Sequence, residues 1–226
     1  MVSNTGGIKL GDIVPDFRAE TSEGPISFHK WLDNSWAILF SHPADYTPVC
    51  TTELARVAQL DGEFKKRGVK LIALSCDGVE SHKGWIEDIK KYGNVPDVSF
   101  PIVADEQRKI ALEFGMLDPD EVDSKGLPLT CRSVFIIGPD KKLKLSILYP
   151  ATTGRNFDEI LRAVDSLFLT SKYPVATPVD WKSGDKCMVQ PWVKPEDEAV
   201  KFPDGVEKVE LPSGKAYLRL TKQSLN

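Results

Sequence analysis

The sequence has no long hydrophobic run. Its longest unbroken apolar stretch is the five residues Trp36–Phe40, whereas a membrane-spanning helix needs about 20. Residues 1–12 also lack the basic start and the apolar centre of a secretory signal peptide. We therefore expect a cytoplasmic protein in a reducing compartment, without a transmembrane segment.

Metal-binding and nucleic-acid-binding patterns are also missing. The chain contains only four cysteines and three histidines, with no C-x-x-C pair and no metal-ligand spacing, which argues against a structural zinc site. Its 29 Lys and Arg residues against 33 Asp and Glu residues give a net charge of −4, so there is no basic footprint for nucleic acid. What remains is a globular composition with ample apolar material for a core.

Apolar runs of strand length alternate with stretches of helical spacing over the first 173 residues. Strands are expected at 36–40, 69–76, 100–103, 131–137 and 142–148, and helices at 48–66, 79–92, 106–114 and 156–170. We expect a small hairpin within residues 1–30 and a polar loop at 118–128. This order predicts an α/β domain, residues 1–173, with a thioredoxin-like fold whose central mixed sheet is flanked by helices.

The composition changes after Tyr173, where prolines punctuate the chain. Residues 174–226 are predicted to form a small C-terminal subdomain. It ends in an expected hairpin, Val206–Leu211 with Ala216–Leu220, around a Pro-Ser-Gly turn. Before this subdomain, Asn156 is followed three residues later by Glu159, a pattern typical of a helix start.

One cysteine lies at the start of a predicted helix. Thr47 suits the N-cap and Pro48 the first helical position, which places Cys50 in the first turn. There, unpaired N–H groups and the helix dipole stabilise a thiolate. A thioredoxin-like reductase carries another cysteine where this chain has Thr47, so disulfide exchange by such a pair is excluded. The pattern predicts a single activated thiolate that attacks a small electrophile such as a hydroperoxide.

Attack on an O–O bond also needs donors and a cation near the sulfur. Thr47 is expected to donate its hydroxyl to the peroxide. Arg132 is the expected cation, because it starts a strand that should run beside the strand before the loop. Glu53 would orient Arg132, and Pro43 would hold the loop rigid and exclude water. His42 either supports the site or only hydrogen-bonds within the loop.

The remaining cysteines have simpler interpretations. Cys76 and Cys131 lie in apolar strands, so we expect both to be core residues. Cys187 lies in the proline-rich tail, in a context that gives no role for it.

The stretch Pro43–Cys50 matches the P-x-x-x-T-x-x-C motif, and the chain resembles the one-cysteine peroxiredoxins of the peroxiredoxin-6 type. Other matching runs are Ser41–Pro43, Pro48–Glu53, Gly115–Asp118, Leu148–Arg155 and Pro178–Trp181. The resemblance implies a homodimer without a cofactor that reduces hydrogen peroxide and organic hydroperoxides, phospholipid hydroperoxides included, through a sulfenic acid on Cys50. It also implies an external thiol reductant such as glutathione, with a glutathione transferase as the reducing partner.

The chain lacks the V-C-P context that holds the resolving cysteine of two-cysteine relatives. We therefore predict a cycle without a protein disulfide, and in particular without a Cys50–Cys187 link. An exposed Cys50 thiolate without a resolving partner would over-oxidise readily.

Two further functions deserve tests. Vertebrate relatives of this type are also described as phospholipases, and the matching positions here are Ser35, His29 and Asp140. Side chains rather than glycines flank Ser35, which disfavours a nucleophile elbow, so any such activity should be weak and secondary. The non-enzymatic alternative is a redox sensor or chaperone in which oxidation of Cys50 switches a partner surface.

Overall fold

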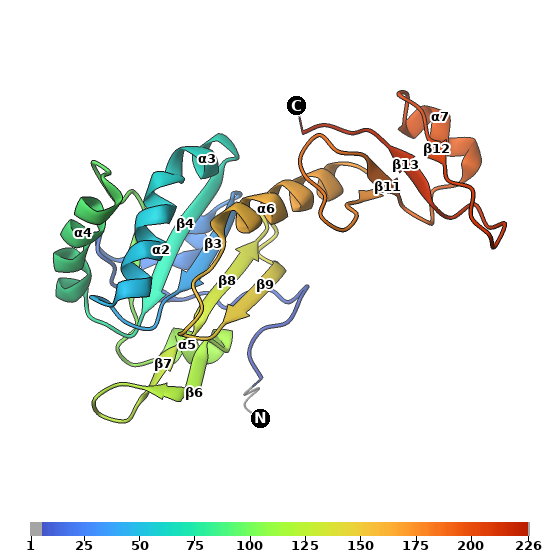
Figure 1. The fold of residues 1–226 in the computed structure, drawn as a ribbon. Coiled ribbons are helices and arrows are strands. Elements are labelled where there is room, and N and C mark those ends of the chain that lie inside the picture. The colour runs from blue at the N-terminus through green and yellow to red at the C-terminus, as the bar shows by residue number, and fades with distance from the viewer. Residues whose placement is uncertain (1–5, 226) are drawn as a thin grey trace. The chain divides into compact units, whose positions relative to one another are not determined.

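The computed structural model describes residues 6–225, and contacts divide the chain into two compact units, Met1–Arg155 and Asn156–Asn226 (Figure 1). The outermost ends of the two predicted domains, residues 1–5 and 226, lie outside the described residues. The division falls before helix α6 (Phe157–Lys172), because Leu169 of this helix belongs to the hydrophobic core of the second unit. The domain boundary between residues 173 and 174 stays a prediction.

A five-stranded mixed sheet forms the centre of the first unit, in the order β5-β4-β3-β8-β9 (Figure 1). The strands are β3 (Trp36–Ser41), β4 (Val69–Ser75), β5 (Ile102–Ala104), β8 (Arg132–Ile137) and β9 (Leu143–Tyr149). β4 and β5 extend the sheet from β3 in parallel, whereas β8 and β9 extend it on the other side in antiparallel fashion. The predicted mixed sheet and the predicted neighbourhood of β8 and β3 are both confirmed.

Helices follow the strands largely where the apolar spacing predicts them. They are α2 (Pro48–Gln59), α3 (Asp61–Lys66), α4 (Val79–Gly93) and α5 (Lys109–Phe114). α2 and α4 pack side by side over one face of the sheet (Figure 1). The single helix expected at 48–66 is interrupted at Leu60, whose backbone leaves helical geometry (φ −91°, ψ 2°) before a segment weakened by glycine.

The N-terminal segment contains the expected hairpin and one unpredicted helix. β1 (Arg18–Ala19) pairs with β2 (Ile26–Ser27) in antiparallel fashion. The five-residue helix α1 (Phe28–Leu32) follows at once and buries two apolar side chains. A helix this short has too few residues to show a helical period in the sequence.

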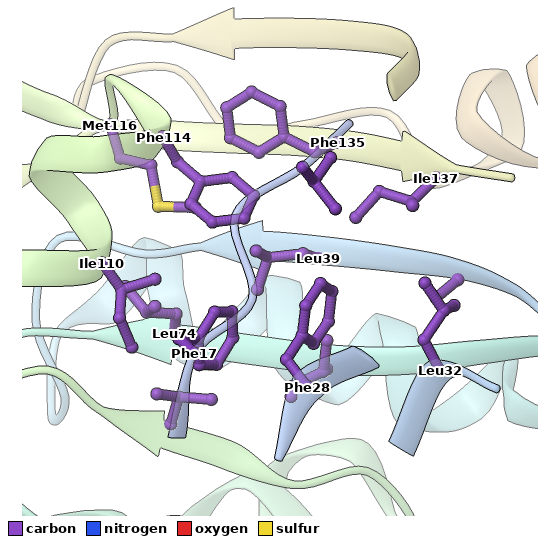
Figure 2. Close-up of a cluster of buried hydrophobic side chains, with 14 of the residues drawn as sticks. Phe17, Phe28, Leu32, Leu39, Leu74, Ile110, Phe114, Met116, Phe135 and Ile137 are labelled. Atoms are coloured by element: carbon purple, nitrogen blue, oxygen red, sulfur yellow. The ribbon is translucent and has the colours of Figure 1, made fainter. Parts of the chain in front are cut away.

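The core on one face of the sheet combines aliphatic side chains with contacting phenylalanine rings (Figure 2). Phe17 stacks on Phe28 with ring centroids 4.6 Å apart, and Phe114 meets Phe135 edge to face at 5.6 Å. Leu39 of β3 points into this core from the sheet. Since side chains alternate along a strand, this packing fixes which residues of β3 face each side.

The polar stretch 118–128 is not a loop as expected. It belongs to a two-stranded ribbon in which β6 (Leu117–Val122) pairs with β7 (Pro128–Thr130). Arg108 ties the ribbon to the domain by donating to the Pro128 carbonyl at 2.7 Å and to Asp123 at 2.7 Å. Backbone pairing and an arginine from another segment hold this ribbon, so its strands do not need alternating apolar residues. Because that alternation is missing, the sequence predicts a loop.

The second unit begins with α6, whose N-cap is the predicted one. The Asn156 side chain accepts hydrogen bonds from the backbone N–H groups of Asp158 and Glu159, at 3.0 and 3.2 Å. A four-stranded sheet follows, in the order β10 (Val175–Ala176), β11 (Cys187–Val189), β13 (Arg219–Thr221) and β12 (Glu207–Lys208), with the short helices η1 (Pro195–Asp197) and α7 (Glu198–Lys201). The expected C-terminal hairpin is present as β12 and β13, although shorter. Within residues 6–225, no helix has both the length and the apolar character needed to cross a membrane.

Candidate active site

The loop between β3 and α2 carries the predicted thiol. Thr47 has extended backbone geometry at the N-cap position, and Pro48 opens α2, so Cys50 is the third residue of the helix. The Cys50 side chain is buried, with 0% exposure, which corrects the expectation of an exposed thiolate. No local pattern in the sequence indicates this burial.

Arg132 lies directly beside the sulfur. Its Nη1 is 3.3 Å from Cys50 Sγ and also donates to Glu53 Oε2 at 2.8 Å. The Nε and Nη2 groups both donate to the Ala151 carbonyl, at 2.9 and 2.7 Å. The guanidinium is therefore held on two sides, and its Nη1 nitrogen faces both the thiol sulfur and the carboxylate.

Arg155 is a further site residue, for which the sequence predicts no role. It donates to Glu53 through its backbone N–H (2.7 Å), its Nε (3.0 Å) and its Nη2 (2.7 Å). Its Nη1 donates to the carbonyls of Ser41 and Ser133, at 2.9 and 2.7 Å, which ties the ends of two strands together. Its place at the end of Leu148–Arg155, a run that resembles the one-cysteine peroxiredoxins, is the feature of the sequence that points to it. Burial of an arginine cannot be recognised in a single sequence.

Charge around the sulfur is unbalanced in the direction that favours an anion. Burial alone would raise the pKa of Glu53, but the charges and hydrogen bonds of Arg155 and Arg132 outweigh it and hold this pKa below its ordinary value. Two guanidinium groups therefore surround one carboxylate, and the Glu53 charge offsets only one of the two positive charges beside the Cys50 sulfur.

The Thr47 hydroxyl is engaged within the loop, because Oγ1 donates to the Ala44 carbonyl at 2.8 Å. To donate to a peroxide, this hydroxyl must rotate away from that carbonyl, and its expected role stays a prediction. Pro43 is buried at the start of the same loop.

A buried polar cluster lies behind the loop. His42 Nε2 is 2.8 Å from Asp45 Oδ1, so His42 does hydrogen-bond within the loop. His82 and Ser81 of α4 contact the other Asp45 oxygen, at 2.7 and 2.8 Å. The sequence predicts neither α4 residue at this site, since both follow Asp45 by more than 30 positions and share no motif with it.

Part of this cluster has the composition of a metal site. His42, Asp45 and Asp77 offer one ligand atom each within 4.8 Å of one another. However, Asp77 Oδ2 already accepts from the Asp45 backbone N–H and from the Ser75 hydroxyl, both at 2.8 Å. The cluster is thus arranged as a hydrogen-bond network.

Two protein families match this chain. Residues 10–146 match the AhpC/TSA family, and residues 167–201 match the C-terminal domain of 1-Cys peroxiredoxin. The chain belongs to the AhpC/TSA family, as a one-cysteine peroxiredoxin. It is accordingly a thiol-dependent peroxidase that works through cysteine redox chemistry.

Relatives match this peroxiredoxin over nearly its full length. Peroxiredoxin-6 of Gallus gallus is 62% identical over 221 residues, which cover 96% of this chain and 98% of the relative. A cysteine-to-serine mutant of peroxiredoxin 6 from Arenicola marina superposes with a TM-score of 0.94 at 62% identity, covering 96% of this chain and 99% of that one. The yeast mitochondrial 1-Cys peroxiredoxin, solved to explain thiol resolution via glutathione/thioredoxin systems, gives a TM-score of 0.85 at 42% identity, covering 96% of this chain and 100% of the yeast chain.

Two of the three candidate hydrolase residues of this peroxiredoxin are engaged in other contacts. His29 Nε2 lies 2.9 Å from the Val14 carbonyl, and Asp140 accepts from Lys144 Nζ at 2.6 Å. Ser35 lies in the turn between α1 and β3. Over residues 6–225, no hydrogen bond joins Ser35, His29 and Asp140, so the structure does not bring them together as a catalytic triad.

The other cysteines of this peroxiredoxin are free thiols. Cys187 is buried in the second unit, where its Sγ donates to the Thr221 carbonyl at 3.4 Å. Cys76 and Cys131 are half-buried, which corrects the expectation of core positions, because each lies just beyond a strand end. Burial raises the pKa of Cys76 to about 11 and also raises that of Cys131.

Proposed function

We propose that Cys50 is the thiol that reacts with peroxide, and that Arg132 and Thr47 assist it. The observation that carries this proposal is the position of Arg132 Nη1, shared between Cys50 Sγ at 3.3 Å and Glu53 Oε2 at 2.8 Å. A cation held this close stabilises a thiolate and can also stabilise negative charge on a departing oxygen.

In the reaction, the Cys50 thiolate attacks the terminal oxygen of R–O–O–H. The S–O bond forms as the O–O bond breaks, which leaves a sulfenic acid on Cys50 and an alkoxide that takes up a proton to give the alcohol. Arg132 and the Thr47 hydroxyl donate to the peroxide oxygens during this step. Arg155 acts as a positioning residue, because its three hydrogen bonds to Glu53 fix the carboxylate that holds Arg132.

Reduction of the sulfenic acid requires an external thiol. A first thiol condenses with it to give a mixed disulfide and water, and a second thiol releases Cys50 and leaves as the oxidised disulfide. Glutathione, with a glutathione transferase as partner, is our proposal, and thiol resolution via glutathione/thioredoxin systems in the yeast relative supports the thiol class. We expect no Cys50–Cys187 disulfide on non-reducing gels after one equivalent of peroxide.

The substrates are hydrogen peroxide and organic hydroperoxides, those of phospholipids included, as the resemblance to the peroxiredoxin-6 type implies. The protein acts in the cytoplasm as a homodimer. Support for a dimer comes from β9, which is an edge strand of the sheet and carries Leu148 at 57% exposure. An edge of this kind can pair with the same strand of another copy.

Stopped-flow reduction of hydrogen peroxide tests the proposal. Cys50→Ser should abolish the reaction, whereas Cys187→Ser, a matched change of another buried cysteine, should leave it unchanged. Arg132→Lys keeps a charge but loses the fork of donors, and we expect a rate about 100-fold lower.

Retention of the wild-type rate by Cys50→Ser would overturn the assignment. Repeated peroxide consumption with excess thiol fits an enzyme, whereas a single stoichiometric oxidation would favour the alternative of a redox sensor. The secondary phospholipase remains a separate prediction, which fatty-acid release lost in Ser35→Ala and kept in Cys50→Ser would support.

A further inference from the structure

Helix α4 contacts the thiol loop through a fully buried carboxylate. Asp45 lies in the middle of the loop, and its two oxygens together contact His42 at 2.8 Å, Ser81 at 2.8 Å and His82 at 2.7 Å. The side chains of Asp45 and both histidines are at most 1% exposed. A carboxylate removed from water this completely needs compensation by a positive charge or by several donors.

The two ring nitrogens of His82 both face acceptors. Nδ1 is 2.7 Å from Asp45 Oδ2, and Nε2 is 3.2 Å from the Val103 carbonyl oxygen. A carbonyl only accepts hydrogen bonds, and so does an ionised carboxylate, whereas a neutral imidazole has a single N–H to donate. Both contacts are hydrogen bonds only when His82 carries two ring protons, which makes it an imidazolium.

The state of Asp45 agrees with this assignment. Burial alone would raise the pKa of Asp45, but its hydrogen bonds to His42 and His82 outweigh burial and hold the pKa well below the ordinary value. Asp45 is therefore ionised, and a charged histidine beside it supplies a compensating positive charge in addition to the hydrogen bonds.

His42 is the neutral histidine of the two. Its Nε2 faces Asp45, so this nitrogen carries the proton, and its Nδ1 is buried without a hydrogen-bond partner among the described residues. Burial, the largest influence, lowers the pKa of His42. The cluster thus consists of an ionised Asp45, a charged His82 and a neutral His42 in the Nε2–H form.

We propose that the buried His82–Asp45 ion pair positions the thiol loop, so that both are positioning residues of the peroxidase reaction. The inference rests on the proposed role of Cys50, because what the pair fixes is the loop that carries Thr47 and leads into α2. Tyr46, directly after Asp45, has a left-handed backbone (φ 54°), which a bulky side chain adopts only when its surroundings hold it there.

A second contact from α4 supports the same assignment. Trp85 Nε1 donates to the Thr51 hydroxyl at 3.1 Å, one residue after Cys50, and its ring lies 4.9 Å from that of His42. α4 therefore contacts the segment before the thiol through His82 and the segment after it through Trp85.

The ionisable groups around His82 come from three elements. The loop contributes Asp45 and His42, and the turn after β4 contributes Asp77, which accepts from the Asp45 backbone. On α4 itself, Glu80 and Lys83 pair with each other at 3.1 Å. Two other elements contribute polar groups that do not ionise. β5 contributes the Val103 carbonyl, and α2 contributes the Thr51 hydroxyl, which accepts from Trp85.

Nitrogen NMR of the full-length protein with ¹⁵N-labelled histidine tests the protonation state directly. At neutral pH we expect His82 to have both ring nitrogens protonated and His42 only one.

A pair of variants separates the charge from a simple hydrogen bond. His82→Asn keeps a donor near the position of Nδ1 but removes the charge, and we expect the rate per folded molecule to fall about tenfold. Ser81→Ala removes a neutral donor from the same Asp45 oxygen, and we expect a change of less than about threefold. Circular dichroism of both variants gives the folded fraction.

Several results would overturn the inference. They are a singly protonated His82 at neutral pH, equal rates per folded molecule for the two variants, or a His82→Asn rate loss that matches its loss of folded protein. Failure of the proposed function is distinguishable, because it appears as peroxide reduction by Cys50→Ser. An inactive Cys50→Ser together with a fully active His82→Asn would remove only the positioning role.

Discussion

Replacing Glu53 with glutamine tests the charge arrangement around the thiol. Glu53 is buried and accepts four hydrogen bonds, one from Arg132 and three from Arg155. Glutamine has nearly the same shape, but one of its two terminal atoms is an amide nitrogen that donates. Whichever way the amide is turned, that nitrogen faces two donors, and both guanidinium groups lose their counter-charge.

The magnitude follows from the burial of the three groups. Breaking a buried ion pair by neutralising one partner costs about 3–5 kcal/mol, because the other charge remains buried and uncompensated. For a chain of this length, each kcal/mol corresponds to about 2–4 °C in the unfolding midpoint. We therefore expect Glu53→Gln to lower the midpoint of the first unit by about 6–20 °C at neutral pH.

The effect should depend on pH with a definite sign. The pKa of Glu53 is lowered from 4.5 in the folded protein, so the unfolded state binds its proton first as the pH falls. The stabilisation by the carboxylate is present above the unfolded pKa and is lost as the pH falls through the lower, folded value. The difference between wild type and Glu53→Gln should accordingly shrink below about pH 4.5.

Thermal unfolding followed by circular dichroism at several pH values is the assay. Glu63→Gln is a matched control, because Glu63 also pairs with two cations, Lys66 and Arg67, but on the exposed surface of α3. Its replacement should leave the midpoint nearly unchanged, since exposed ion pairs contribute little. A Glu53→Gln midpoint equal to that of the control would refute the reasoning.

Three other predictions follow from single contacts. Thr47→Val should slow peroxide reduction about 10- to 100-fold because the hydroxyl donor is lost, whereas Thr47→Ser should retain most of the wild-type rate in the same stopped-flow assay. Cys76, whose pKa burial raises to about 11, should resist iodoacetamide in the folded protein at neutral pH and react after denaturation, as mass spectrometry can show. Asn156→Ala should destabilise the second unit by about 1 kcal/mol in urea unfolding through loss of the α6 cap, and Asn156→Asp should not.

Local patterns account for the parts of the fold that the sequence predicts well. The apolar runs at β3 and β4 and the Thr47-Pro48 start of α2 each depend on a few consecutive residues, so they can be recognised without knowledge of the rest of the chain. The polar ribbon of β6 and β7 could not be recognised in this way, because its residues lack apolar alternation and Arg108, which contacts it, lies outside the segment.

The sequence by itself determined that a cysteine without a partner cysteine lies at a helix start. It also determined that the strand beginning with Arg132 lies next to β3, the strand before the thiol loop. Only the tertiary structure decided that Cys50 is buried, that Arg155 holds Glu53 and that His82 contacts Asp45. These contacts join residues 102 and 37 positions apart. Hydrogen bonds across such separations leave no period or spacing in a sequence, because they form only after the strands and helices have packed.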